Sequence, residues 1–468
     1  ILTLIGFSLI LWSISNPKYI TTAFLILLNM AIFSIPFIMK KELDFFEPVI
    51  IMILMSQIRH VLRPVYWLET GYVDLPILID NDMKWNSINK GLIYNIIGLL
   101  IYYLGYYSGI GWNIANRIGD FEFVRNSEWD ANKVKKCIIA FSLVGFMFYC
   151  IIVYINGGLM NMLKGWSTRS KLFAGEFYFL WGFSALVISS YILFCFYITT
   201  RKTIKKTMFT WIHILFTAIL MFTFGGRGRV VSFFLVLLTL YNYLKHKIGT
   251  KMLLIFAFLA ILFLQAALLL RESTWRGSFD IYAIEQLNFG RFDKIIKSFL
   301  ERPNFDYYAS VIALVPNKVP LQMGRTYLSL LAAPIPRKLW KNKPFIHEGS
   351  YVRNLISPEE TGGRPIGNIG IFYLNFHIPG IVIGMFILGL FNSVLYSFLK
   401  NNINNRNIIL LYSILLVPSL SLTNDAFIEF TETVFILGIV FKIVRRKLNS
   451  RLGEELNDKE KIKKNMLL

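Results

Sequence analysis

The arginines of this 468-residue chain are its residues best suited to chemistry, because guanidinium groups bind phosphate through paired hydrogen bonds and stay charged. Four groups of them stand out in connections that we expect to be external, and neighbouring glycines let backbone N–H groups approach the same anion. The groups are Arg169; Arg227 and Arg229; Arg271 and Arg276; and Arg325, Arg337, Arg353 and Arg364. The pattern predicts an anion site. Phospholipid contacts and loop ion pairs are the ordinary alternatives.

His347 and Glu348 are the best candidates for acid–base chemistry. Imidazole titrates near neutral pH, and a desolvated carboxylate can act as a base. Because Arg337, Arg353 and Arg364 lie nearby in sequence, we expect positive charge to depress the pKa of both groups. His347 would then be neutral and Glu348 ionised, which are the proton-accepting forms. The alternative is a loop histidine that caps a backbone group.

The remaining titratable residues have simpler interpretations. His60 lies beside Arg59 and Arg63 in an apolar run, which is typical of a polar network in a helix-bundle core. Asp80 and Asp82 fit a turn, although they could also form a catalytic acidic pair. No histidines are paired at metal-ligand spacing and no nucleotide-binding motif is present, so we expect neither a metal nor another cofactor.

Composition indicates which elements position these groups. Hydrophobic residues make up 55% of the chain, charged residues 16%, and the mean hydropathy is +0.54. Runs of about twenty apolar residues recur, the length that a helix needs to cross a bilayer. The sequence therefore predicts an all-α, polytopic transmembrane bundle of about twelve spans. These are residues 1–14, 20–39, 48–67, 88–111, 137–155, 177–199, 207–224, 230–244, 252–270, 369–399, 408–422 and 427–441.

The net charge of +21 falls on the connections between spans. In a soluble protein it would favour nucleic acid, but membrane topology and lipid phosphates explain it here, so we expect no nucleic-acid partner. Basic connections such as 245–251 and 400–406 are expected in the cytoplasm. We divide the chain into spans and short loops at 1–270, a large external Arg-rich segment at 271–368, spans at 369–448 and a charged cytoplasmic tail at 449–468.

Three motifs between residues 225 and 384 resemble a known family. Gly225-Gly226-Arg227-Gly228 opens a span, Pro334-Ile335-Pro336-Arg337 lies in the large segment, and Gly362-Gly363-Arg364-Pro365 precedes another span. With these motifs the chain resembles the Wzy-type polymerases of O-antigen and capsule repeat units. In topology the resemblance covers most of the chain.

The resemblance implies a helical, GT-C-like glycosyltransferase fold, which O-antigen ligases share. It also implies an enzyme that transfers a growing chain from undecaprenyl pyrophosphate to a lipid-linked repeat unit, on the outer face of the bacterial cytoplasmic membrane. Partners would be undecaprenyl-pyrophosphate-linked oligosaccharides and membrane lipids. A chain-length regulator protein is a further candidate partner.

The resemblance also assigns roles to residues. External arginines of the family hold the pyrophosphate without a metal, which points to Arg227 and Arg364 by motif. His347 corresponds to the catalytic histidine in the large external loop of the ligases. Independently of the resemblance, we keep Glu348 as the alternative base. The full candidate set for pyrophosphate is Arg169, Arg227, Arg229, Arg271, Arg276, Arg337, Arg353 and Arg364. Candidates to stack on sugar rings, or to anchor at the membrane interface, are Trp275, Tyr307, Tyr308 and Tyr351.

Three other functions stay open on sequence alone. A flippase or transporter of lipid-linked oligosaccharides would also need about twelve spans, although the large external segment and the lack of duplicated halves favour an enzyme. An O-antigen ligase would differ mainly in its acceptor. A lipid-phosphate-sugar glycosyltransferase would use Asp80 or Asp82 as base, together with a metal.

Overall fold

The structure is a computed structural model, and it describes residues 19–40, 42–71, 73, 75, 81–118, 128–173, 176–200, 203–275, 305–335, 339–360 and 362–445. The predicted span 1–14, the tail, Asp80, Arg276 and Arg337 lie outside these residues. The described part of the chain is built from helices, which confirms the all-α prediction.

Eight segments of the described chain are long and apolar enough to cross a membrane. The helices that form them are α2 (Ile20–Met39), α3 with α4 (Pro48–His60 and Leu62–Thr70), α5 (Asn81–Tyr107), α7 (Ala131–Ile155), α10 (Phe177–Thr199), α11 (Ile204–Thr223), α13 (Thr250–Trp275) and α18 (Gly367–Asn401). Each coincides with a predicted span. The chain is therefore a multi-pass membrane protein.

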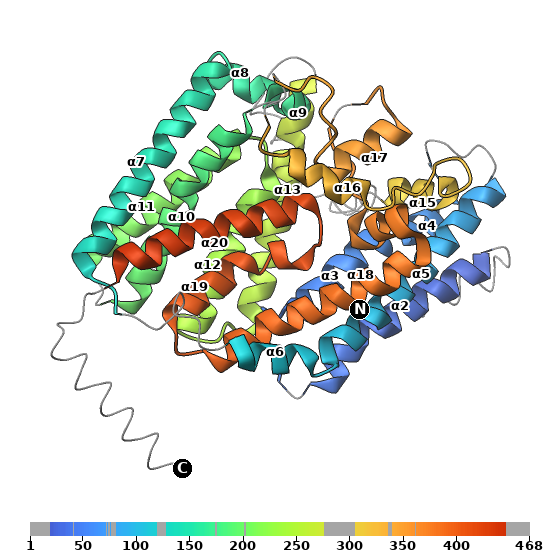
Figure 1. Ribbon diagram of the computed structural model, residues 1–468, viewed down its shortest axis with the longest axis horizontal. Coiled ribbons are helices and arrows are strands. Elements are labelled where there is room, and N and C mark those ends of the chain that lie inside the picture. The colour runs from blue at the N-terminus through green and yellow to red at the C-terminus, as the bar shows by residue number, and fades with distance from the viewer. Residues whose placement is uncertain are drawn as a thin grey trace, which may run out of the picture.

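The other helices of the described residues complete the fold. They are α6 (Ile110–Ile118), α8 (Leu159–Lys164), η3 (Gly165–Thr168), α9 (Arg169–Leu172), α12 (Arg227–Leu244), α15 (Phe305–Leu314), α16 (Arg325–Leu328), η6 (Ser329–Ala332), α17 (Glu348–Ile356), α19 (Arg406–Leu415), η7 (Pro418–Leu420) and α20 (Asn424–Val444). Figure 1 shows α8, α9 and α17 along one edge of the molecule and α6 at the opposite edge.

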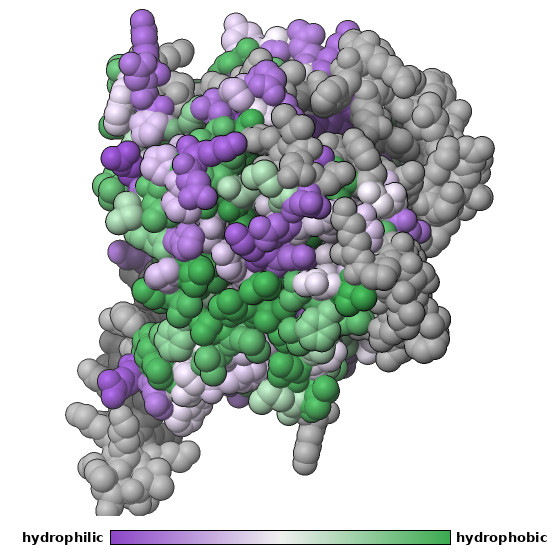
Figure 2. All heavy atoms as spheres, turned by 90° about the vertical axis from the view of Figure 1, so that its right-hand side faces the viewer, coloured by the Kyte–Doolittle hydropathy of each residue, from purple (hydrophilic) through white to green (hydrophobic). Residues whose placement is uncertain are grey.

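The helices pack around two buried cores. One core is formed mainly by α2 to α5, α15 and the first half of α18, and the other by α7, α10 to α12, α19 and α20. Helices α5 and α18 approach so closely that a Cβ on Gly105 would lie 2.3 Å from the Phe386 carbonyl oxygen. Small residues permit such contacts between membrane helices. On the side seen in Figure 2, a band of hydrophobic side chains crosses the molecule below a hydrophilic upper part, as expected for a surface that meets lipid.

The connections between spans gather into two groups. At one end, Lys247 bonds to Glu42 at 3.1 Å and the Arg406 guanidinium donates to Thr199 Oγ1 at 3.1 Å. These connections are the ones predicted to be cytoplasmic. At the other end, Tyr178 donates to the Pro334 carbonyl, which joins two connections predicted to be external. The structure thus groups the connections as the charge pattern predicts, and the assignment of each end to a side of the membrane remains a prediction.

This topology predicts opposite labelling of two exposed positions. In a protein without its native cysteines, Glu359→Cys should react with a membrane-impermeant maleimide in intact cells. Lys247→Cys should react only after the membrane is opened, because its connection is expected inside. Labelling of Lys247→Cys but not of Glu359→Cys in intact cells would reverse the assignment.

The large segment is less polar in structure than its sequence suggested. Its helix α15 is buried against α5 and α18, and the Tyr308 hydroxyl donates to the Gly91 carbonyl oxygen at 3.1 Å. The expectation that Tyr307 and Tyr308 stack on sugars or anchor at the membrane interface is therefore wrong. The apolar run from Phe305 to Leu314 explains this, because it buries more surface in the core than at an interface.

Helix α18 is interrupted, and the break holds the external segment in place. The backbone leaves helical geometry at His377 (φ 58°, ψ −147°), just before Pro379. Since Pro379 has no N–H to donate four residues back, the Asn375 carbonyl is released and accepts a hydrogen bond from the Met323 N–H at 3.0 Å. The Asn375 side chain accepts a second one from the Gly324 N–H at 3.0 Å. The kink therefore fixes the start of α16.

Candidate functional site

Four of the predicted arginines converge in one group, which we call the arginine cluster: Arg169, Arg227, Arg229 and Arg271. They come from α9, the start of α12 and the end of α13. The Gly225–Gly226 turn makes this possible, because Gly225 adopts a φ of +67° and the chain reverses directly from α11 into α12.

Hydrogen bonds to backbone carbonyls hold two members of the cluster. Arg169 Nη1 donates to the Gly225 oxygen at 3.1 Å, and Arg227 Nη1 donates to the Leu264 oxygen at 3.2 Å. Arg229 is exposed and makes no hydrogen bond within the described part of the chain. It is therefore the member most available to a ligand.

The positive charges of the arginine cluster repel one another. Desolvation, followed by the charges of Arg229, Arg271 and Arg227, lowers the pKa of Arg169 to about 10. The guanidinium nevertheless stays protonated at neutral pH. Like charges held together repel each other, so a bound anion with several negative oxygens would relieve the repulsion and gain charge-assisted hydrogen bonds.

His347 forms an ion pair with Asp425, the second residue of α20. A carboxylate can only accept, so the bonded Nδ1 of His347 carries a proton and Nε2 is left as the acceptor when the ring is neutral. The His347 side chain is 58% exposed, so a reactant can reach it. The arrangement matches the histidine and carboxylate of acid–base dyads.

Glu348 is buried beneath this pair. Its side chain is 4% exposed, and its Oε1 accepts the Asn424 N–H at 2.6 Å. Asn424 also donates through Nδ2 to the carbonyl oxygens of Thr326 (2.7 Å) and Ile346 (2.8 Å). One asparagine thus ties the first turn of α20 to α16 and to the start of α17, and fixes the dyad in place.

The expected pKa depression of both groups is wrong. The hydrogen bond that His347 donates to Asp425 is the largest influence on His347, and it raises the pKa of that imidazole despite opposing effects of desolvation and of Arg229. Burial raises the pKa of Glu348 to about 7, against the hydrogen bond from Asn424. Sequence proximity to Arg353 and Arg364 misled the expectation, because an acidic residue distant in sequence contacts His347 directly.

Arg229 connects the arginine cluster to the dyad. Its charge acts on His347, and also on Glu429 and Glu432 of α20. An anion bound by the cluster would therefore lie near a group able to accept a proton. This juxtaposition can support a reaction in which an anionic leaving group departs while a hydroxyl loses its proton.

The two other described candidates, Arg353 and Arg364, lie in a second group. Arg364 forms an ion pair with Glu360, at 2.5 Å from Nη2 to Oε2, and its guanidinium lies over the Tyr307 ring. Arg353 donates from Nε to the Gly362 oxygen at 3.2 Å. Their assignment to pyrophosphate remains a prediction. Nothing is added for Arg276 and Arg337, which are outside the described residues.

Sequence reasoning missed Asp425 and Asn424 as site residues. The signal was present, because the two polar residues interrupt the apolar sequence between α19 and α20 on the side predicted to be external. The interpretation of His60 is confirmed: it is buried, and its Nδ1 lies 3.1 Å from the Ser56 oxygen within a polar core network. In the described residues no group of three or more His, Cys, Asp or Glu is placed to hold a metal.

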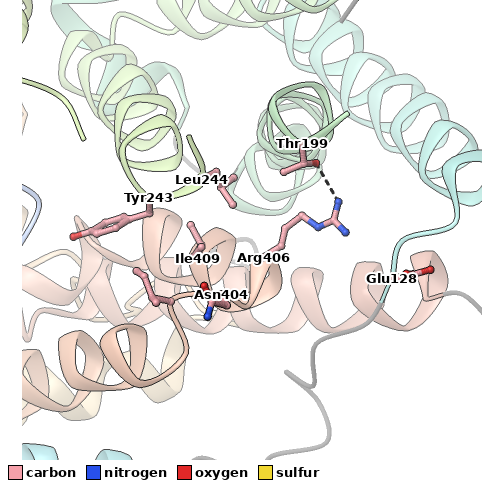
Figure 3. A pocket seen from close by; sticks show the side chains of 8 residues that line it. Glu128, Thr199, Tyr243, Leu244, Asn404, Arg406 and Ile409 are labelled. Atoms are coloured by element: carbon pink, nitrogen blue, oxygen red, sulfur yellow. Dashed lines mark hydrogen bonds between the residues drawn. The ribbon is translucent and has the colours of Figure 1, made fainter. Parts of the chain in front are cut away.

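Two cavities lie at different places in the fold. One, of about 560 Å³, is at the predicted cytoplasmic end, where Arg406 donates to Thr199 (Figure 3) and its guanidinium lies over the Trp129 ring. It is built from connections remote from the dyad. The other, of about 320 Å³, is lined by Arg325, Leu328, Ser329, Leu331, Ala332, Trp340 and Pro344. It adjoins the site, because Ser329 Oγ accepts a hydrogen bond from Asn424 at 3.1 Å.

Comparison with protein families gives one result. The family described as O-antigen polysaccharide polymerase Wzy matches residues 1–449. Comparisons with curated proteins and with solved structures gave no match. The family match spans nearly the whole chain and confirms the resemblance of the motifs. The chain belongs to the O-antigen polysaccharide polymerase Wzy family and is a polymerase of lipid-linked oligosaccharide repeat units.

Proposed function

We propose that the chain transfers a growing oligosaccharide from undecaprenyl pyrophosphate to a lipid-linked repeat unit, on the extracytoplasmic face of the bacterial cytoplasmic membrane. The observation that supports this most directly is the convergence of the arginine cluster and the His347–Asp425 dyad through Arg229. A chain-length regulator protein is the further partner we expect.

The proposed chemistry uses each part of the site. Neutral His347 accepts the proton of the acceptor hydroxyl at Nε2, and Asp425 stabilises the imidazolium that forms. The acceptor oxygen bonds to the anomeric carbon of the donor sugar, and the bond from that carbon to the pyrophosphate oxygen breaks. The pyrophosphate leaves with the electron pair. The arginine cluster stabilises the charge that develops on it most strongly in the transition state, so the reaction proceeds without a metal.

The apolar cavity beside the site suits the lipid part of the substrate. Leu328 and Leu331 are exposed although they belong to the external segment, while Thr326 and Ser329 on the same segment are buried and hydrogen-bonded. This arrangement places apolar side chains outward and polar ones inward, as for a surface that faces lipid. We assign it to the first isoprene units of the carrier lipid.

A reconstituted reaction tests the proposal. The purified protein in detergent, supplied only with lipid-linked repeat units, should lengthen them without a nucleotide sugar or an ion gradient. The reaction should persist in a chelator, because arginine supplies the positive charge. Inhibition by chelator that a divalent ion reverses would favour the glycosyltransferase that uses Asp80 or Asp82. Movement of lipid-linked sugar across vesicles without elongation would favour a flippase.

A further inference from the structure

Arg63, at the predicted external end of a membrane span, is buried without hydrogen-bond partners for two of its nitrogens. The residue is 7% exposed, and its Nε and Nη1 have no partner in the described part of the chain. Its guanidinium lies over the rings of Tyr66 and Trp67, with centroids at 5.6 and 5.2 Å. Aromatic faces offer no acceptor for these N–H groups, and unpaired buried donors are costly. The position therefore suits a ligand that brings acceptors.

The neighbours of Arg63 make this a site rather than one isolated residue. Asp306 at the start of α15 also has a buried oxygen, Oδ1, with no partner among the described residues, and the charges of Arg63 and Arg364 act on it.

We call this group the α4–α15 cluster: Arg63, Asp306, Arg353, Glu360 and Arg364. The charges of Arg364 and Arg353 act on Glu360, and Arg364 acts on Asp306 as well, so Arg364 joins the exposed part of the group to the buried part. Three arginines face two carboxylates, so the cluster keeps a net positive charge. Arg364 is 39% exposed, which leaves the group open to solvent on one side. A phosphate-bearing ligand fits these charges better than a neutral sugar does.

Helix α17 relates this cluster to the candidate active site. Its first residue, Glu348, adjoins the His347–Asp425 dyad, whereas Arg353 in its last turn belongs to the α4–α15 cluster. Nine helical residues extend roughly 13 Å. Arg229 of the arginine cluster acts on His347 at the start of this helix, so the two basic clusters lie toward its opposite ends; Figure 1 shows where α17 lies in the fold.

We propose that the α4–α15 cluster binds the pyrophosphate of the acceptor, while the arginine cluster binds that of the donor. The inference rests on the proposed function. Donor pyrophosphate is bonded to the reacting carbon and must lie beside the dyad. Acceptor pyrophosphate is attached at the reducing end, separated by its oligosaccharide from the hydroxyl that attacks. It needs a basic site away from the dyad, and the far end of α17 supplies one.

Two acceptor substrates distinguish binding of the acceptor pyrophosphate from any other role of the α4–α15 cluster. The donor is a labelled lipid-linked chain with a blocked non-reducing end, so that it can only donate. One acceptor is the lipid-linked repeat unit, and the other is the same oligosaccharide as a methyl glycoside without phosphate. We expect Arg63→Gln and Arg364→Ala to raise the KM for the lipid-linked acceptor about tenfold, as for loss of one charged contact. The kcat should be retained, and use of the methyl glycoside should not change.

Control variants define the remaining outcomes. Arg229→Ala, in the donor site, should slow transfer to both acceptors, and Lys318→Ala, an exposed cation of the same segment, should affect neither. Arg364 is half-exposed, so its variant tests the site even if Arg63→Gln folds poorly. An unchanged KM for the lipid-linked acceptor in Arg364→Ala, or equal loss with both acceptors, overturns the acceptor site. No transfer by the unaltered protein instead overturns the proposed function.

Discussion

Replacement of Arg229 by alanine is expected to nearly abolish polymer formation while the protein still inserts and folds. Arg229 is exposed, makes no hydrogen bond in the described part of the chain, and lies where its charge reaches both Arg169 and His347. A charged hydrogen bond contributes about 1.5–3 kcal/mol, which corresponds to roughly ten- to a hundredfold in rate. Because the contact strengthens as the pyrophosphate departs, kcat should fall more than donor affinity.

Single-turnover transfer from a labelled donor measures this effect. Arg229→Lys should recover part of the rate, since it restores the charge without the paired hydrogen bonds. Lys318→Ala provides the matched control for loss of an external positive charge. Arg227→Ala should affect stability as well as rate, because Arg227 also bonds to the Leu264 carbonyl. A normal rate in Arg229→Ala would remove the arginine cluster from the reaction.

His347→Ala should lower the rate by about a hundredfold or more, the usual range for loss of a general base. Glu348→Gln should be much milder, because Glu348 is buried and the amide oxygen can still accept the Asn424 N–H. The base must be neutral, so the rate should rise with pH through the pKa of His347. Asp425 raises that pKa, and Asp425→Asn should therefore move the rising limb to lower pH while reducing the maximum rate.

The measurement is kcat/KM for the lipid-linked acceptor between about pH 5.5 and 9. If the rate of His347→Ala still rises with pH near pH 7 and that of Glu348→Gln does not, Glu348 is the base, since its pKa is about 7. If neither variant changes the profile, leaving-group stabilisation by arginine must drive the reaction without either residue.

The sequence predicted the eight spans found in the described residues, because their signal is local, whereas the predicted spans 230–244, 408–422 and 427–441 are not among these eight. An apolar run of about twenty residues can satisfy its backbone polar groups only as a helix in lipid, and this holds whatever the neighbouring helices are. The buried α15 was harder to predict. Its ten residues are too few to span, and only contact with α5 and α18 shows where it is buried. The break at His377 follows from Pro379. The hydrogen bond that the released Asn375 carbonyl accepts from the Met323 N–H cannot be predicted from the apolar sequence of α18 alone.

The arginines of the site were predictable as a set, and their grouping was not. Residue type and position outside the spans singled out Arg169, Arg229 and Arg364 alike. Only the packing of helices places two of them in the arginine cluster and the third beside Glu360. Asp425 was missed for the same reason, because it contacts His347 although the two residues are 78 positions apart in sequence. Charges nearby in sequence therefore predicted a lowered pKa for His347, whereas its pKa is raised.

The kink in α18 has a mechanical consequence for the whole enzyme. The carbonyl that Pro379 releases accepts its hydrogen bond from Met323, so the external segment shares its backbone bonding with a helix of the membrane core. Opening the segment therefore means breaking bonds of the core itself, and the two should unfold as one cooperative unit rather than as a scaffold with a loose appendage. The same connection lets tilting of α18, in a bilayer of different thickness, displace α16 and, through Asn424, the dyad. We therefore expect the rate of transfer at the proposed site to depend on the thickness of the surrounding bilayer.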